Sequence, residues 1–365
     1  MTRMASMEQT LREVVWPRRG VRGWVGWLAL QPASALFAVG VALRNAGYRI
    51  GILRAKRAGI PVISVGNLSV GGTGKTPITL WLARQLASDG TRVAILLRGY
   101  AGDAREVTVV SEGNGPVVAV DLVGDEAAML AKCFHGVVLT ARQRLEGVAR
   151  AQKLGCQVVV LDDGFQHRAL ARNFDLVLVN GRKGEVLPAG PMREPETALQ
   201  RADAIAVVNK SEEPFAPQDG MRGKPTFRAR LKPTAVLEPD GGVWHEQPVT
   251  VLGGRRVAAV CGIADPAPFY AALRRWEAQV IEVFEFPDHH RYTQADWQRL
   301  LRETRNVECI VTTEKDLVKL EHFPFARGKL LALRVVPEVE DGDALVAMIR
   351  RRAGLDAQEE SHGNQ

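Results

Sequence analysis

One glycine-rich stretch constrains the fold more than any other part of the chain: residues 66–77, which read G-N-L-S-V-G-G-T-G-K-T-P. The apolar residues 61–65 precede it, and apolar residues at helical spacing follow it from Ile78 to Leu86. A strand, a glycine loop and a helix in this order are the context of a phosphate-binding loop. The stretch therefore predicts a nucleoside triphosphate site where a buried strand turns into a helix.

The eight residues from Ser69 to Thr76 read S-V-G-G-T-G-K-T, so Ser69 replaces the first glycine of the G-x-x-x-x-G-K-[ST] pattern. Glycines let backbone N–H groups turn inward and surround phosphate oxygens. Lys75 is expected to reach the β- and γ-phosphates, and the Thr76 hydroxyl is expected to bind Mg²⁺. The predicted nucleotide-binding residues are Ser69, Val70, Gly71, Gly72, Thr73, Gly74, Lys75 and Thr76.

Beyond the loop, runs rich in Val, Ile and Leu alternate with helical or loop segments. Such runs are typical of parallel strands that helices cover on both faces. We therefore predict an α/β protein with a phosphate-loop lobe and a second, smaller lobe. The expected strands are 92–97, 117–120, 137–140, 157–161, 175–179, 204–208, 256–261, 280–286, 309–312 and 330–336.

The segment between the two alternating blocks is richer in Pro and Gly and has only weak apolar runs, at 235–237 and 249–252. We interpret it as a connection, with a small hairpin that acts as a hinge. The predicted division is an N-terminal basic, Trp-rich segment, a phosphate-loop lobe, a hinge, a second lobe and a polar tail. Their ranges are 1–60, 61–211, 212–254, 255–353 and 354–365.

The net charge and the spacing of the cysteines indicate the kind of partner and the cellular compartment. The 365 residues carry a net charge of +7, which indicates an anionic partner: nucleic acid, a phosphorylated substrate or an acidic membrane surface. The sign of the charge does not choose among these. The cysteines are widely spaced and form no C-x-x-C pair, so we interpret them as reduced core thiols of a cytosolic protein. They are Cys133, Cys156, Cys261 and Cys309.

The start of the chain is unusual. Trp16, Trp24 and Trp27 lie close together, and a mostly apolar run, 25–43, follows with arginines on both sides. Pro32 interrupts this run, and its flanking charges favour an interfacial membrane anchor over a spanning helix. Trp at a headgroup boundary and Arg toward anionic lipid suit a peripheral membrane protein. A helical hairpin packed on the first lobe is the alternative, and the two are compatible.

A second motif, V-V-V-L-D-D-G-F-Q-H at 158–167, is a run of apolar residues that ends in two carboxylates. This pattern is typical of the strand that holds Mg²⁺ in phosphate-loop enzymes. Adjacent residues of an extended chain point in opposite directions, so one of Asp162 and Asp163 is expected to face the metal and the other to orient its neighbours. The sequence does not show which.

Several further motifs, each alone, are more typical of turns than of catalysis. Together with the loop they resemble the tetraacyldisaccharide 4′-kinase family of lipid A biosynthesis. The resemblance covers about residues 20–340, and D-D-G-F-Q-H and T-T-E-K-D are its most specific parts. The matching motifs are V-G-N-L-S-V-G-G-T-G-K-T-P (65–77), R-G-Y (98–100), G-D-E (124–126), D-D-G-F-Q-H (162–167), G-P-M-R-E-P (190–195), D-H-H (288–290) and T-T-E-K-D (312–316).

The resemblance implies ATP-dependent phosphorylation of the 4′-hydroxyl of tetraacyldisaccharide 1-phosphate, which gives the 1,4′-bisphosphate. It also implies peripheral association with the cytoplasmic face of the bacterial inner membrane. The expected fold is two α/β/α lobes that close on ATP around a hinge. The expected partners are the lipid A precursor and the membrane surface, with a monomeric enzyme and no nucleic acid.

The resemblance also assigns roles to residues. Asp125 and His289 would form the dyad that takes the proton from the attacking hydroxyl, with Lys75 as the third catalytic residue. Because the dyad's two residues belong to different lobes, it would form only on closure. The residues expected to serve Mg²⁺ are Thr76, Glu126, Asp162 and Asp163. Arg193 and Glu194 would line the site near the transferred phosphate, and the other candidate site residues are Arg98, Gln166 and His167.

Two other functions are compatible with parts of the sequence. A GTPase or partner-regulating ATPase also uses G-G-T-G-K-T, and Asn209-Lys210 nearly begins the guanine-reading N-K-x-D pattern, but the fourth position is Glu212. A nucleic-acid-binding NTPase suits the basic charge. However, no basic stripe with interleaved aromatics occurs outside the Trp-rich start.

Overall fold

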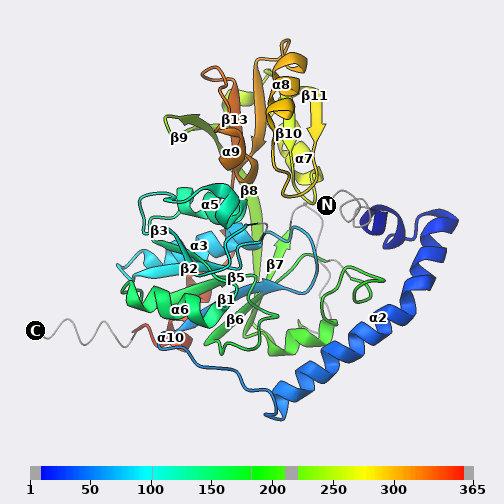
Figure 1. Cartoon of the computed structure of the whole chain (residues 1–365), viewed down its shortest axis with the longest axis vertical. Coiled ribbons are helices and arrows are strands. Elements are labelled where there is room, and N and C mark those ends of the chain that lie inside the picture. The colour runs from blue at the N-terminus through cyan, green and yellow to red at the C-terminus, as the bar shows by residue number, and fades with distance from the viewer. Residues whose placement is uncertain (1–9, 101, 182, 210–220, 357–365) are drawn as a thin grey trace, which may run out of the picture.

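The computed structural model describes residues 10–100, 102–181, 183–209 and 221–356. Its strands form one continuous sheet, and most neighbouring strands within it are parallel. Figure 1 shows a larger lobe below and a smaller lobe above, with helices packed along both. The predicted α/β class with two lobes is therefore confirmed.

The larger lobe has a parallel sheet whose residues are almost entirely buried, as expected from the runs of Val, Ile and Leu. Its helices α3 (Lys75–Ala87) and α5 (Asp125–Cys133) pack on one face and α6 (Arg144–Lys153) on the other. The four cysteines are buried and free, which confirms them as core thiols. The strands are β1 (Val62–Asn67), β2 (Val93–Leu97), β4 (Val137–Thr140), β5 (Val158–Asp162), β6 (Phe174–Val179) and β7 (Ala204–Asn209).

One strand of this lobe was predicted in the wrong place. The edge strand is β3 (Thr108–Ser111), which pairs antiparallel with β4. The predicted strand 117–120 is wrong, because a short helix, α4 (Val120–Val123), begins at its last residue. Val117 is 72% exposed and donates its backbone N–H to Val110 beside the edge strand. Periodicity does not separate strand from helix over so short an apolar run.

The smaller lobe repeats the alternation predicted for it. Its core is formed by β10 (Arg256–Cys261), β11 (Gln279–Glu285) and β12 (Cys309–Thr313), which pair in parallel. Its helices are α7 (Ala267–Arg275), α8 (Gln294–Glu303) and α9 (Glu314–Leu320). Thr293 and Asp296 form a reciprocal capping box at the start of α8, which fixes where that helix begins.

Two long strands carry the sheet from one lobe to the other. Strand β8 (Thr226–Asp240) begins parallel to β7 and continues as the partner of β9 (Val243–Pro248) and of β13 (Leu330–Val339). The strand order is β11-β10-β12-β13-β8-β7-β6-β1-β5-β2-β4-β3. The weak run 249–252 forms a short 3₁₀ helix. The division into domains stays a prediction, and the residues 210–220 at its first boundary lie outside the described residues.

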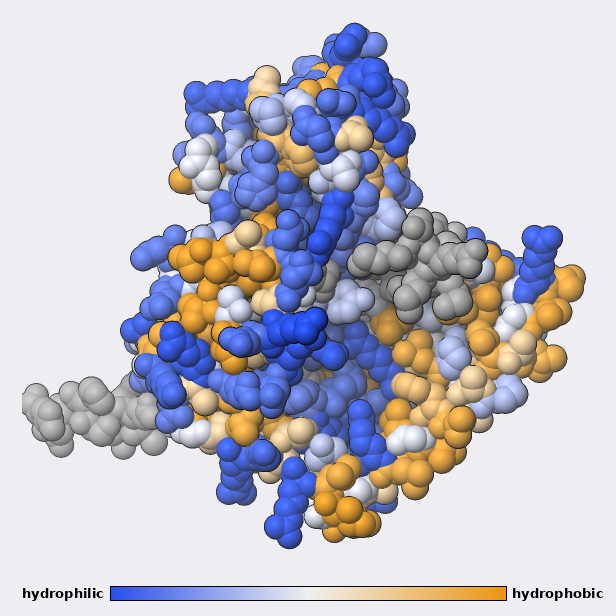
Figure 2. All heavy atoms as spheres, in the orientation of Figure 1, coloured by the Kyte–Doolittle hydropathy of each residue, from blue (hydrophilic) through white to orange (hydrophobic). Residues whose placement is uncertain are grey.

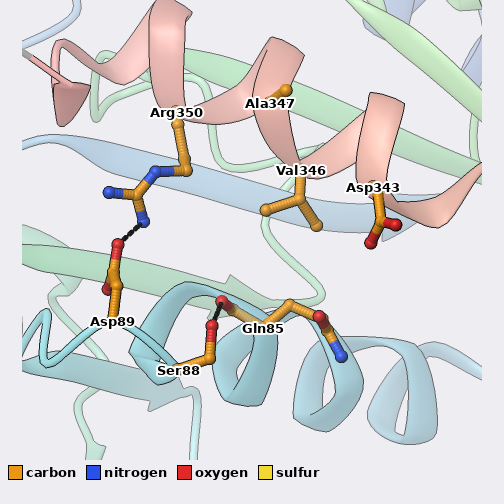
Figure 3. Close-up of a pocket in the computed structure, with 7 residues that line it drawn as sticks. All are labelled: Gln85, Ser88, Asp89, Asp343, Val346, Ala347 and Arg350. Carbon is orange, nitrogen blue, oxygen red and sulfur yellow. Dashed lines mark hydrogen bonds and ion pairs between the residues drawn. The ribbon is translucent and has the colours of Figure 1, made fainter.

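The last helix returns to the larger lobe. After β13, α10 (Gly342–Ala353) packs against α3, β1 and β6. Figure 3 shows the hollow between α10 and the end of α3, where Arg350 forms an ion pair with Asp89. This hollow lies at the opposite end of α3 from Lys75, so it is separate from the phosphate-binding loop. The end of the predicted tail, 357–365, lies outside the described residues.

The N-terminal region forms one long helix, α2 (Gly20–Arg49), with Pro32 inside it and a short π-helix, Leu11–Val15, before it. The short helix folds back on the first turns of α2, where Val14 and Val15 lie against Gly23 and Gly26, so a helical hairpin occurs only at this end of the region. By length and composition α2 is the one described helix apolar enough to cross a membrane. Leu28, Leu36 and Leu43 are each at least 66% exposed, and Figure 2 shows hydrophobic side chains along this helix. Its buried edge includes Ser34 and Val41.

Candidate active site

The phosphate-binding loop connects β1 to α3, as predicted. Gly71 and Gly74 have φ of 95° and 81°, a region that favours glycine. A side chain at Gly74 would also press on Leu231 of β8. The amide of Asn67 braces the loop from inside, because its Nδ2 donates to the Ser69 carbonyl at 2.7 Å and to Thr73 Oγ1 at 2.8 Å. The loop therefore has a defined shape that comes from its own residues.

Lys75, the first residue of α3, lies beside two oxygens of the same lobe. Its Nζ donates to Asn67 Oδ1 at 3.1 Å and lies 3.6 Å from Asp163 Oδ1. The side chain is only 14% exposed. The ammonium group is thus held next to the loop whose glycines are expected to surround phosphate.

The last residue of β5, Asp162, and the residue after it, Asp163, have different partners. Asp162 accepts hydrogen bonds from the Thr76 hydroxyl at 3.0 Å and the Thr79 hydroxyl at 3.1 Å. Asp163 has a left-handed φ of 57° and accepts from Arg193 Nη1 at 2.9 and 2.8 Å. Asp162 is therefore the carboxylate that shares a site with Thr76.

The ionisation of Asp162 is governed by its surroundings. Burial raises the pKa of its carboxyl group to about 7, and the negative charge of Glu126 adds to this rise, while Lys75 opposes it. Burial also acts on Asp163, but the charges of Lys75 and Arg193 outweigh it and lower the pKa of that carboxyl. A cation beside Asp162 and Glu126 would relieve the repulsion between them.

The segment that contains Arg193 supports the loop through its backbone. Val70 donates its N–H to the Pro191 carbonyl at 2.8 Å, and Arg193 donates its N–H to the Leu68 carbonyl at 2.6 Å. Gln166 Nε2 donates to the Asn67 carbonyl at 2.8 Å. Arg193 and Gln166 thus contact the loop, and the expected position of Arg193 near the transferred phosphate stays a prediction.

Asp125 and His289 come together from different lobes. Asp125 begins α5 in the larger lobe, and His289 follows β11 in the smaller lobe. Asp125 Oδ1 lies 2.9 Å from His289 Nδ1. Asp125 is 4% exposed, and the ring of Tyr100 lies 5.2 Å from the imidazole. The geometry brings together the two residues of the expected dyad.

The local backbone fixes both members of this pair. Gly124, before Asp125, has a φ of 88°, and a side chain there would meet the Tyr100 carbonyl at 2.3 Å. His289 itself has a left-handed φ of 60°, which is uncommon outside glycine and is frequently found at functional sites. These constraints aim the imidazole at α5 and at the end of the larger lobe.

Two lysines of α9 complete the pair, and the sequence analysis gave them no role. Lys319 Nζ lies 3.1 Å from Asp125 Oδ2. Lys315 Nζ donates to Asp288 Oδ1 at 2.9 Å and lies 3.3 Å from His289 Nε2 and 3.7 Å from Glu126 Oε1. The motif T-T-E-K-D, which ends β12 and begins α9, did mark this segment. The partners of its lysine in the other lobe cannot be predicted from neighbouring residues.

The charges of this cluster act on both members of the pair. Burial raises the pKa of Asp125, but the hydrogen bond from His289 and the charges of Lys315 and Lys319 outweigh it, so the pKa lies far below its usual value. Burial lowers the pKa of His289, yet the hydrogen bond and the charge of Asp125 raise it more, despite Lys315. Asp125 is therefore a carboxylate near neutral pH.

Three further candidates are Glu194, Arg98 and His167. Glu194 is fully buried, and its carboxylate accepts from Arg201 at 3.0 and 3.1 Å and from Asn45 of α2 at 2.8 Å. Arg98 follows β2 and is exposed. For His167, burial and then the charge of nearby arginines lower the pKa of the imidazole. Lys210 and Glu212 of the N-K-x-D comparison lie outside the described residues.

A phosphate-binding loop and a carboxylate of one lobe, with an imidazole from a second lobe, define a two-lobed phosphotransferase of the P-loop class. A family model described as "LpxK: Tetraacyldisaccharide-1-P 4'-kinase" matches residues 26–353. The chain therefore belongs to the tetraacyldisaccharide-1-P 4′-kinase family and is a kinase, which confirms the resemblance seen in its motifs.

Relatives and a solved structure agree with this. The chain is 41% identical to the tetraacyldisaccharide 4′-kinase of Anaeromyxobacter sp. (strain K) over 357 residues, covering 92% of this chain and 94% of the relative. It is 38% identical to that of Syntrophus aciditrophicus, covering 80% and 84%. The structure of LpxK from Aquifex aeolicus in complex with ATP is similar at a TM-score of 0.77 and 35% identity, covering 89% of this chain and 99% of that one.

Proposed function

We propose that the protein transfers the γ-phosphoryl group of ATP to the 4′-hydroxyl of tetraacyldisaccharide 1-phosphate and releases the 1,4′-bisphosphate and ADP. The observation that carries this proposal is the Asp125–His289 pair, in which an imidazole of the smaller lobe meets a carboxylate of the lobe that also carries the phosphate-binding loop. The names of the relatives supply the acceptor, and the ATP complex of the similar structure supplies the donor.

In this mechanism His289 accepts the proton of the attacking hydroxyl. Its Nδ1 faces the Asp125 carboxylate, so the proton on that nitrogen is donated to Asp125 and Nε2 is the nitrogen that accepts. Asp125 orients the ring and stabilises the charge it gains. The loop backbone and Lys75 hold the phosphates in place and balance their charge, which is most of what phosphoryl transfer requires of a protein.

Mg²⁺ would be held by the Thr76 hydroxyl and the Asp162 carboxylate, with Glu126 close by. Among the described residues, no three His, Cys, Asp or Glu side chains converge on one point as a ready-made cation site. Mg²⁺ at kinase sites is usually held by one or two carboxylates together with substrate phosphates, so this oxygen donor set fits the ion. When bound, the ion would neutralise charge on the β- and γ-phosphates. Asp163 instead holds Arg193.

The exposed apolar surface of α2 supports the second half of the proposal, peripheral association with the cytoplasmic face of the inner membrane. Arg44 and Asn45 tie the inner edge of α2 to Glu194, and Ser34 donates to the Val186 carbonyl at 2.7 Å. A helix held along one edge by polar contacts suits binding to a membrane surface, where the acylated substrate and anionic lipid are found. Because the dyad comes from one chain, we propose a monomeric enzyme.

The test is transfer of ³²P from γ-labelled ATP to tetraacyldisaccharide 1-phosphate in detergent micelles, with γ-labelled GTP as a competing donor and Lys75→Ala as background. We expect lysine-dependent labelling of the lipid, with ATP preferred. Hydrolysis of ATP without labelled lipid would show that the acceptor is wrong. Preference for GTP, or binding to oligonucleotides that weakens with salt, would favour the alternative functions instead.

A further inference from the structure

The side chain of Lys315 contacts candidate site residues of both lobes. Lys315 stands in the first turn of α9, directly after β12. Its Nζ lies 2.9 Å from Asp288 Oδ1, 3.3 Å from His289 Nε2 and 3.7 Å from Glu126 Oε1. The side chain is 16% exposed. The ammonium group therefore lies between the base in the smaller lobe and an acidic residue of the larger lobe.

The contact with His289 involves the nitrogen that the reaction needs. With Nδ1 donating to Asp125, Nε2 carries the lone pair of the imidazole. A lysine ammonium group only donates hydrogen bonds, so at 3.3 Å it donates to that lone pair. While it does so, Nε2 has no free lone pair with which to accept a proton from a hydroxyl group.

The same ammonium group is linked through Glu126 to the side of the site where phosphate is expected. Glu126 contacts Lys315, and its charge also acts on Asp162 at the end of β5, which receives the Thr76 hydroxyl. Phosphate bound by Lys75 and the loop would thus lie across from Lys315. Lysine is a compact charge on a flexible four-carbon stem, so it can change partners without movement of the backbone.

Resting on the function proposed above, we propose that Lys315 is a further catalytic residue. It covers Nε2 of His289 until both ATP and the lipid are bound, then contacts the γ-phosphoryl oxygens and leaves Nε2 open to the acceptor hydroxyl. In the step, the acceptor O–H bond breaks and its proton goes to Nε2. The acceptor oxygen bonds to the γ-phosphorus, and the bond from that phosphorus to the β–γ bridging oxygen breaks, with its electron pair leaving on ADP. Lys315 transfers no proton and balances phosphoryl charge.

A purely structural role would look different. Lys319 provides the comparison within the same helix, because its Nζ contacts two carboxylates, Asp125 at 3.1 Å and Asp316 at 3.0 Å, and lies over the ring of Tyr292. If Lys315 were a similar brace between α9 and α5, its loss would lower stability and affect ATP hydrolysis and lipid phosphorylation alike. A residue that covers the base and then contacts phosphate changes the ratio between the two reactions.

The test compares Lys315→Met and Lys315→Arg with Lys232→Met, the same change at a half-exposed lysine of β8 that pairs with Glu338. Lipid phosphorylation and lipid-independent ATP hydrolysis are measured across pH, with thermal unfolding alongside. For Lys315→Met we expect kcat for lipid phosphorylation to fall about 10²-fold with a much smaller change in KM for the lipid. Lys315→Arg should recover part of the loss, and Lys232→Met should match the wild type.

Two readouts are specific to the proposal. The ratio of hydrolysis to phosphorylation should rise in Lys315→Met, because Nε2 is then open to water. The low-pH limb of kcat/KM should move to higher pH, because the charge of Lys315 lowers the pKa of His289. The other groups that face this imidazole, Asp125, Asp288 and the Tyr100 ring, are unchanged in the variant.

The outcomes separate the two proposals. Wild-type protein that labels no lipid would overturn the proposed function. Wild-type protein that labels lipid, with Lys315→Met equally active, would overturn the role of Lys315 alone. A parallel loss of both reactions, with an unmoved pH limb and a lowered unfolding temperature, would show that Lys315 is a brace and would also overturn the inference.

Discussion

The phosphate-binding loop and the Asp125–His289 pair are built in different ways. The loop, Lys75 and Asp162 all belong to the larger lobe, where Asn67 holds the loop and Lys75, and Thr76 donates to Asp162. The pair joins residues 164 positions apart, and each member belongs to a different lobe. One half of the site is therefore complete within a single lobe, and the other exists only while the two lobes are together.

This difference indicates that the Asp125–His289 pair depends on how the two lobes are placed relative to each other. Because β8 and β13 run between the lobes, a change in their geometry would move His289 relative to Asp125. Phosphate binding and proton transfer should therefore respond to different substitutions. Water attack on ATP would also be limited when the lobes separate, since the base would then be withdrawn.

Loss of Lys75 should have the largest effect. Lys75→Met removes the charge that lies against the loop, so we expect both lipid phosphorylation and ATP hydrolysis to fall to background. The measurement is turnover of both reactions beside the Lys232→Met control. Activity near the wild-type level in Lys75→Met would remove the loop from the site.

Loss of the base should come next and should spare nucleotide binding. His289→Ala removes the proton acceptor from the second lobe, so we expect kcat to fall about 10²-fold or more. The affinity for a fluorescent ATP analogue should stay close to that of the wild type, because the loop is unaffected. An equal loss of nucleotide affinity would mean that the two halves are not separate.

The pH dependence should follow the pair rather than the loop. The imidazole must be neutral to accept a proton, so kcat/KM should be lost as pH falls through the pKa of His289, which lies above its ordinary value. Asp125→Asn removes the charge that raises this pKa. We therefore expect a lower rate and a low-pH limb displaced to lower pH. A limb that stays in place or moves upward would contradict the pairing.

Substitutions of the adjacent residues Arg193 and Glu194 should have smaller effects on turnover, and the two effects should differ. Arg193→Ala breaks the contacts with Asp163 beside the loop, and we expect about a tenfold loss of turnover. Glu194→Gln should cost less turnover but weaken the attachment of α2, because Glu194 contacts Asn45 and Arg201 instead of the loop. Limited proteolysis of α2 and turnover, compared between the two variants, test this. A larger turnover loss in Glu194→Gln would place its carboxylate at the reaction.

The loop and the Asp125–His289 pair also differ in how far the sequence could predict them. The loop and the strand that ends in Asp162 follow from local patterns, because apolar runs, glycines and their spacing act over a few residues. The pairing of Asp125 with His289 was reached only through family resemblance, since nothing local joins the two. Lys315 and Lys319 received no role and Glu194 was placed at the phosphate, because side-chain partners across the fold carry no local signal. The prediction of a strand at 117–120 was wrong because a short apolar run does not distinguish a strand from a helix.

The central claim, that Asp125 and His289 act as one unit across the lobes, is tested most directly by a double-mutant cycle. Lipid phosphorylation is measured for the wild type, Asp125→Asn, His289→Ala and the double variant, with nucleotide affinity as a control for folding. If the two act together, the double variant will be little slower than His289→Ala alone. Losses that multiply in the double variant would mean that the two residues contribute independently, and the dyad would have to be abandoned.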